Sequence, residues 1–209
     1  NYSTGERQVL IEQDDDWVPL FEYNAMAEKG FYPRGFGLDP NILYYSAYHG
    51  DYLALYKMNL KTRDSELVFA DENYDVDGRL IYSSQSGDAI GIRHAQAPNG
   101  RHYWDHRWTV LQKLVDEAMP DYHNVLVSFN QDESRYILLS QADGKPPMYS
   151  IGDVGKNQLN VLFHQYPQLY DTPLPEHRKV SFTARDGLTI EGYLTVPLTG
   201  KAPYPTIIH

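Results

Sequence analysis

The 209-residue sequence contains no cysteine, which excludes disulfide bonds, thiolate metal sites and a cysteine nucleophile. It also lacks an excess of positive charge: 28 acidic residues outnumber 18 lysines and arginines, and the formal net charge is −10. Nucleic acids and anionic membrane surfaces attract basic proteins, so we expect neither as a partner. No apolar run approaches the roughly 20 residues that span a bilayer.

Tyrosine is the commonest aromatic residue, with 18 copies, and 42% of the chain is apolar. That apolar share is enough for a core, and tyrosine suits half-buried strand surfaces. From residue 35 onward, turn-forming clusters at His49–Asp51 and Lys61–Asp64 separate the runs ILYYSAY, YLALYKMNL and ELVFA. Short strands at this spacing predict an all-β sandwich, barrel or propeller.

Two more strands are expected near the start of the chain, within Thr4–Glu12 and Trp17–Tyr23. The acidic run Asp14–Asp16 lies between them. We interpret this run as a solvated turn. A calcium site is less favoured, because the run has neither spaced oxygen ligands nor a turn glycine.

The chain repeats itself, as a propeller should. A shift of 93 residues places Asp39 on Asp132 and Tyr56 on Tyr149, and an intermediate copy begins around Asp77. The first step, from residue 39 to 77, is 38 residues, close to the roughly 40–45 residues of a four-stranded blade. The second step, from residue 77 to 132, is 55 residues, so an insert is expected there. About three blades are predicted, whereas a closed propeller has about 4–8.

The expected insert is a helix over Trp108–Tyr122 that ends near Pro120. Apolar residues recur along one stripe at helical spacing: Trp108, Leu111, Val115, Ala118 and Met119. Polar residues occupy the opposite face: Gln112, Lys113, Asp116 and Glu117. This pattern predicts one amphipathic helix inserted into the strands.

The final segment predicts a hairpin. Alternating runs at Val180–Ala184 and Leu188–Val196 flank Asp186-Gly187, a dipeptide typical of type I′ turns with positive φ at both residues. A further strand is expected at Thr206–Ile208. Because domains do not normally end inside a strand, we expect this chain to be a piece of a longer protein.

The segment VSFTARDGLTIEGYLTVP…PYPTIIH resembles the start of the catalytic domain in the prolyl oligopeptidase family of serine peptidases, which includes acylaminoacyl-peptidases and dipeptidyl aminopeptidases. The segment YDVDGRLIY…GRHYWDHRWTVLQKLVDEAMP resembles a propeller blade of bacterial peptidases in that family. The resemblance implies an all-β partial β-propeller of four-stranded antiparallel blades with one inserted helix, followed by the N-terminal hairpin of an α/β-hydrolase domain. Blades would occupy residues 1–172. Residues 173–209 would hold the first hydrolase strands, after a linker near Asp171–His177.

No G-x-S-x-G nucleophile motif is present. The resemblance implies that the catalytic triad lies beyond His209, which begins the oxyanion-loop motif, and that no catalytic residue lies in this chain. The whole enzyme would cleave short peptides through an acyl-serine, without a cofactor, while the propeller restricts access. The implied partners are a peptide substrate and the missing hydrolase domain. A stand-alone propeller for protein interactions and a propeller-bearing esterase are the alternatives.

Five residues are candidates for contact with an entering substrate: Arg93, His102, His106, Asp116 and Glu117. His102 and His106 have a spacing that would suit zinc on a helix, but a turn and strand are expected there, so structural or solvated histidines are favoured. With Arg93 and Arg107 they would line the channel or face the active site. Asp116 and Glu117 could bind a peptide's amino group, although the polar face of a helix explains both. Open blade edges could also recruit a second copy.

Overall fold

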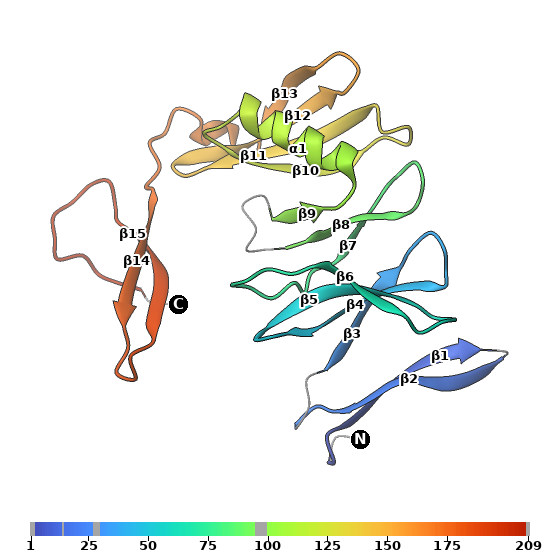
Figure 1. Cartoon of the computed structure of the whole chain (residues 1–209). Helices are drawn as coiled ribbons and strands as arrows, with labels where there is room; N and C mark the ends of the chain where they lie inside the picture. The colour runs from blue at the N-terminus through green and yellow to red at the C-terminus, as the bar shows by residue number, and fades with distance from the viewer. Residues whose placement is uncertain (1–2, 14, 27–29, 95–99, 208–209) are drawn as a thin grey trace. The chain divides into compact units, whose positions relative to one another are not determined.

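The computed structural model describes residues 3–13, 15–26, 30–94 and 100–207. Within these ranges the chain is built of antiparallel strands with one α-helix, which confirms the predicted all-β class (Figure 1). The first nine strands are β1 (Glu6–Gln13), β2 (Asp16–Asn24), β3 (Phe31–Phe36), β4 (Ile42–His49), β5 (Tyr52–Asn59), β6 (Ser65–Phe69), β7 (Leu80–Tyr82), β8 (Ala89–Arg93) and β9 (Arg101–Tyr103). The helix α1 (His106–Ala118) follows, and then β10 (His123–Phe129), β11 (Arg135–Ala142), β12 (Lys145–Asp153), β13 (Gln158–His164), the 3₁₀ turn η1 (Pro167–Leu169), β14 (His177–Thr183) and β15 (Thr189–Thr195).

The chain divides into two compact units, which are treated separately. The first unit comprises residues 1–114 and 131–133, and the second comprises residues 115–130 and 134–209. The predicted boundary between residues 172 and 173 stays a prediction. Among the described residues, no helix has the length and apolar character that crossing a bilayer requires.

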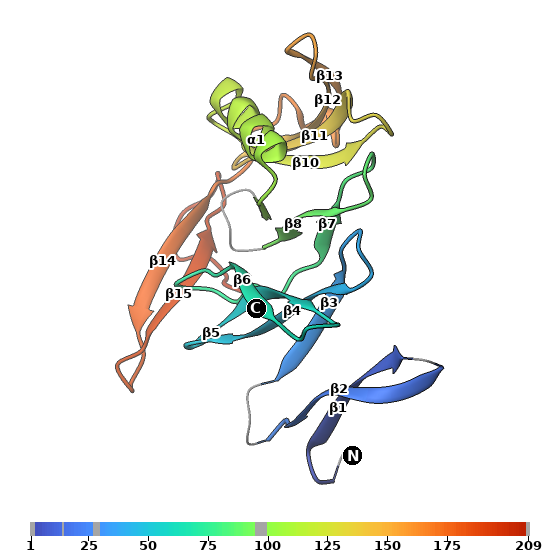
Figure 2. The ribbon, with the colours of Figure 1, turned by 45° about the vertical axis from the view of Figure 1, so that its right-hand side comes forward.

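Each unit contains one four-stranded sheet in which sequence neighbours are also spatial neighbours: β3-β4-β5-β6 in the first and β10-β11-β12-β13 in the second. Figure 2 shows the first of these from a second side. Both sheets pass from their second to their third strand through a glycine with positive φ, Gly50 (70°) and Gly144 (71°). This antiparallel meander is the structure of a propeller blade, so the predicted partial propeller is confirmed.

The two four-stranded sheets also confirm the 93-residue repeat. The starts of β4, β5 and β6, at residues 42, 52 and 65, shift by 93 onto the starts of β11, β12 and β13, at residues 135, 145 and 158. These three strands therefore begin at equivalent positions of the two sequence copies.

The middle copy departs from the four-stranded pattern. Its described sheet has three strands, β7-β8-β9, and the segment before β7 is bonded elsewhere. The Val76 amide donates to the Leu53 carbonyl at 2.8 Å, and the Leu53 amide donates to the Asp75 carboxylate at 2.7 Å. These bonds hold the segment against β5 of the preceding sheet, so it forms no strand of its own.

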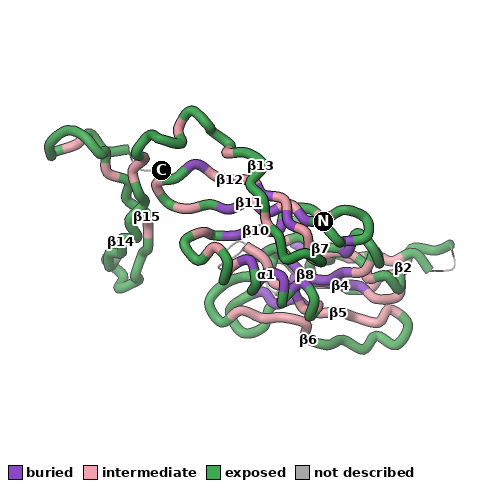
Figure 3. Tube along the Cα trace, turned by 90° about the horizontal axis from the view of Figure 1, so that it is seen from above, coloured by how far each residue is buried: buried purple, intermediate pink, exposed green. Residues whose placement is uncertain are grey.

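The sheets of the first unit share their core. One buried cluster joins β3–β6 to β7–β9 and contains Tyr44, Leu55, Val76, Leu80, Ala89 and Ile92. The Trp104 ring stacks on the Tyr44 ring at 5.5 Å between centroids. A second cluster, around Phe31, Leu43 and Tyr45, packs Val9 and Leu20 from β1 and β2 against the same sheet. Figure 3 shows these buried stretches along β4, β5 and β8.

Helix α1 begins and ends earlier than the predicted Trp108–Tyr122. The Asp105 carboxylate accepts the Arg107 amide at 2.9 Å, and the Asp105 carbonyl accepts the Thr109 amide at 3.1 Å, so Asp105 caps the first turn. Trp108, Leu111 and Val115 are buried as predicted. Two assignments of faces are wrong, because Ala118 is exposed and Gln112 is buried.

The predicted hairpin is present as β14 and β15, which pair from His177↔Thr195 to Thr183↔Thr189. Its turn is not type I′, because Gly187 has a positive φ (88°) and Asp186 does not. The Gly187 amide donates to the Ala184 carbonyl at 3.0 Å, so only the residue that closes the turn needs the left-handed conformation. The expected last strand does not form over Thr206 and Ile207; Ile208 and His209 lie outside the described residues.

Candidate functional site

The predicted contact residues are distributed over both units. Arg93 ends β8 and is exposed, His102 lies half-buried in β9, and His106 is the exposed first residue of α1. The two histidines of the predicted zinc spacing therefore belong to a strand and a helix, rather than to one element. Asp116 and Glu117 lie near the end of α1, in the second unit. His209 lies outside the described residues.

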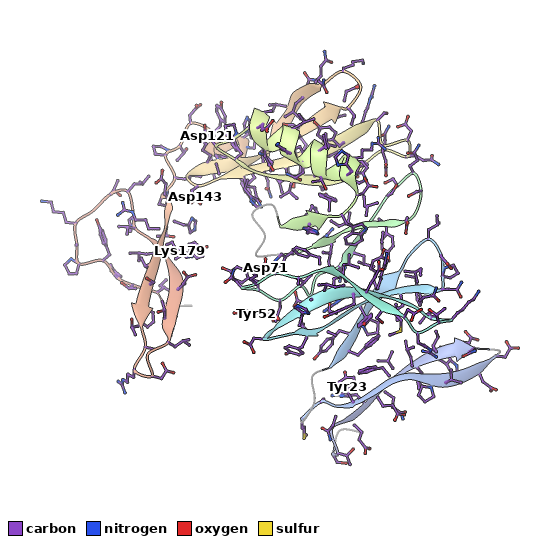
Figure 4. The ribbon with its side chains drawn as sticks, in the orientation of Figure 1. Tyr23, Tyr52, Asp71, Asp121, Asp143 and Lys179 are labelled. Carbon is purple, nitrogen blue, oxygen red and sulfur yellow. The ribbon has the colours of Figure 1, made fainter. Side chains whose placement is uncertain are left out.

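His102 belongs to an aromatic cluster that sequence reasoning did not find. Its ring stacks on Phe69 with 3.6 Å between centroids, and Phe69 meets His94 edge-on at 5.9 Å. His94 is 1% exposed, and its Nε2 lies 3.0 Å from a carboxylate oxygen of Asp71, which is labelled in Figure 4. An imidazole enclosed in this way cannot reach a substrate, so the His94–Asp71 pair is a structural contact.

The same cluster shifts two pKa values. The hydrogen bond from His94, with support from the Asn73 amide, lowers the pKa of Asp71. Burial, with a smaller contribution from His94, lowers the pKa of His102. The first shift favours an ionised Asp71, and the second favours a neutral His102.

Arg93 lies on a basic strand surface. It pairs directly with Arg101 across β8 and β9, and Tyr103 follows two residues later on the same face as Arg101. Tyr103 is 7% exposed. Burial raises its pKa to about 12, although the charges of Arg101 and Arg93 act in the opposite direction. Sequence analysis singled out neither Arg101 nor Tyr103. The alternating Arg-x-Tyr pattern after a turn was the available signal.

Arg107, which was grouped with Arg93, binds a carboxylate in the first unit. Its guanidinium donates to the Glu133 carboxylate at 3.1 Å and to the Glu133 carbonyl at 2.9 Å. Glu133 is 2% exposed, and it also accepts the Ser83 hydroxyl at 2.6 Å. Arg107 and Glu133 therefore tie the start of α1 to the turn that follows β7.

Asp116 also has a structural partner. The buried amide of Asn124 donates to the Asp116 carboxylate at 3.3 Å and to the carbonyl groups of Met119 and Tyr122. The Asn124 side chain in turn accepts the Ser140 hydroxyl at 2.8 Å. This network holds the end of α1 against β10 and β11. Glu117 is exposed.

The described residues contain no group of three or more histidine, aspartate or glutamate side chains that could hold a metal ion. His94 itself is buried, whereas Phe69 and His102 are half-buried. On the other face, Arg93 carries an exposed positive charge, Arg101 is half-buried and Tyr103 is buried. The basic residues of this face are therefore suited to binding an anionic group.

The meander sheets, their repeat and the inserted helix define the chain as part of a β-propeller protein. No family model matches the chain. Its sequence is 27% identical over 177 residues to dipeptidyl aminopeptidase BIII of Pseudoxanthomonas mexicana. The match covers 81% of this chain and 24% of that enzyme, so the chain spans about a quarter of the length of this curated relative. This match confirms the resemblance to the prolyl oligopeptidase family of serine peptidases.

Two solved structures are also similar to the chain. A crystal structure of puromycin hydrolase has a TM-score of 0.47 and 13% identity, over 92% of this chain and 30% of that chain. A crystal structure of TolB from Acinetobacter baumannii has a TM-score of 0.38 and 13% identity, over 87% of this chain and 46% of that chain.

Proposed function

We propose that this chain is the non-catalytic propeller part of a serine peptidase that hydrolyses short peptides through an acyl-serine intermediate. The observation that carries the proposal is the sequence similarity to a dipeptidyl aminopeptidase over 177 residues. The absence of a G-x-S-x-G motif supports a nucleophile outside residues 1–209. Among the activities in the family, we propose dipeptidyl aminopeptidase, which acts on peptides with a free amino terminus.

The role of the blades is to restrict what reaches the catalytic serine. Sheets β3–β6 and β7–β9 are joined by a close-packed apolar cluster, so neighbouring blades cannot separate without exposing it. We infer that such a wall restricts access, so that extended peptides enter and folded domains are excluded.

A ladder of peptides tests this proposal. The protein from the complete coding sequence is assayed on peptides that range from tripeptides to chains of roughly 30 residues, and kcat/KM is expected to fall steeply with length. Replacing Glu133 with Ala removes a tie within the first unit and should raise hydrolysis of the longest peptides relative to tripeptides. Glu66→Ala, which removes an exposed ion pair with Lys57, is the matched control. Equal kcat/KM at all lengths would contradict a gating role.

A further inference from the structure

Two arginines face each other on neighbouring strands of the first unit, where β8 and β9 lie side by side (Figure 1). Arg93 and Arg101 are a register pair, and directly opposite side chains have Cβ atoms about 4.5–5.5 Å apart. Like charges at this separation repel and destabilise a strand pair. The register of β8 and β9 nevertheless places Arg93 directly opposite Arg101.

Neither guanidinium has an acidic partner in the part of the chain that the structure describes. The residues that join β8 to β9, His94 to Gly100, include no Asp or Glu. Burial lowers the pKa of Arg101, Arg93 lowers it further, and only Tyr103 acts in the opposite direction. Arg107 differs, because it contacts the carboxylate of Glu133. Within the described ranges, no carboxylate compensates the positive charge at Arg93 and Arg101.

The same face holds buried donors that lack acceptors. The Tyr103 hydroxyl and Nε of Arg101 are both buried, and no described group is within hydrogen-bond distance of either. A buried donor without an acceptor destabilises the fold. The position of Tyr103 is built into the strands: a Cβ on Gly91 would come within 2.8 Å of its ring, so the glycine makes the space that the ring occupies.

We propose that Arg93, Arg101 and Tyr103 form a binding site for the C-terminal carboxylate of a short peptide. A carboxylate accepts paired hydrogen bonds from a guanidinium and a further bond from a phenol. It would neutralise the opposed charges, and it would satisfy both buried donors once the side chains move apart to admit it. The choice of a peptide as ligand rests on the proposed function.

Paired probes test the site on the 209-residue chain. Trialanine and trialanine amide differ only in the terminal charge, and calorimetry gives the Kd of each. The free acid is expected to bind roughly tenfold more tightly than the amide, because only the acid can form charge-assisted bonds. Arg101→Ala and Arg93→Ala should bring the ratio close to one, and Tyr103→Phe should reduce it by about threefold.

Arg185→Ala is the matched control, because it removes one positive charge from the exposed turn between β14 and β15 and should leave the ratio unchanged. Circular dichroism checks the fold of each variant. Arg93 is exposed, so Arg93→Ala keeps the test valid if Arg101→Ala does not fold. Equal Kd values for acid and amide, or a ratio that survives both arginine variants, would refute the site.

Acetate provides the third arm, since a carboxylate could also come from an aspartate or glutamate of another part of the protein. Acetate binding as tightly as trialanine, with the same dependence on Arg101, would overturn the assignment to a peptide. The outcomes also separate the two proposals. If the unaltered chain binds the acid no more tightly than the amide, the site is refuted, whereas the length dependence of hydrolysis is unaffected. An acid preference without length-dependent hydrolysis refutes the gating role and leaves a carboxylate site.

Discussion

Replacing Glu133 with Ala should cost the first unit a large part of its stability. The Glu133 carboxylate accepts the Ser83 hydroxyl at 2.6 Å and the Arg107 guanidinium at 3.1 Å, and its side chain is 3% exposed. Removing one partner of a buried ion pair costs about 3–5 kcal/mol. Because the Arg107 side chain is 45% exposed and can be rehydrated, we expect the lower end of that range, about 3 kcal/mol.

The loss of unfolding free energy is measured by urea denaturation, with the fluorescence of Trp104 and Trp108 as the signal. Both residues lie in the first unit. Glu133→Gln keeps an acceptor for Ser83 but removes the charge, so it should cost about half as much. Glu66→Ala is the control. The Lys57–Glu66 pair is exposed on both sides, and such pairs contribute about 0–1 kcal/mol. A loss below about 0.5 kcal/mol for Glu133→Ala would refute the reasoning.

Two further predictions concern pH and glycine. Burial and His94 lower the pKa of His102 below its usual 6.5, so the folded state favours neutral His102. Its contribution to stability is therefore complete above pH 6.5 and is lost as the pH falls through the folded pKa. His102→Phe should flatten the dependence of unfolding free energy on pH between about 7 and 5, and an unchanged slope would count against the shift. Gly78→Ala should cost about 2 kcal/mol or more, because the new Cβ would overlap the Arg93 carbonyl oxygen. Gly192→Ala, where the Cβ meets nothing within 4 Å, should change thermal stability little.

The repeat was predictable from sequence because the two four-stranded sheets present their strands and turns in the same order, and three of their strands begin 93 residues apart. The starts of β11, β12 and β13 follow from those of β4, β5 and β6 by a shift of 93 residues. The middle copy was harder to predict. The hydrogen bonds that Leu53 accepts from Val76 and donates to Asp75 join segments more than 20 residues apart, and no local pattern reveals them.

The candidate site shows the same limit. Arg93 was singled out as a basic residue near histidines, but its partner Arg101 follows only from the register of β8 and β9. Glu133 lies in a polar turn, and from its sequence such a turn is expected to be exposed to solvent. Its burial depends on Ser83, which is 50 residues away in the chain. The spacing of His102 and His106 would suit zinc only on one helix, and a turn and strand were expected there; the strand-to-helix transition at Asp105 separates the two residues.

The central claim is that these blades serve a serine nucleophile located outside them. Labelling the protein from the complete coding sequence with a fluorophosphonate, followed by peptide mapping, tests it most directly. We predict that the labelled serine maps outside residues 1–209, and that the 209-residue chain alone is neither labelled nor able to hydrolyse dipeptidyl nitroanilides. A label on any serine within residues 1–209 would contradict the account.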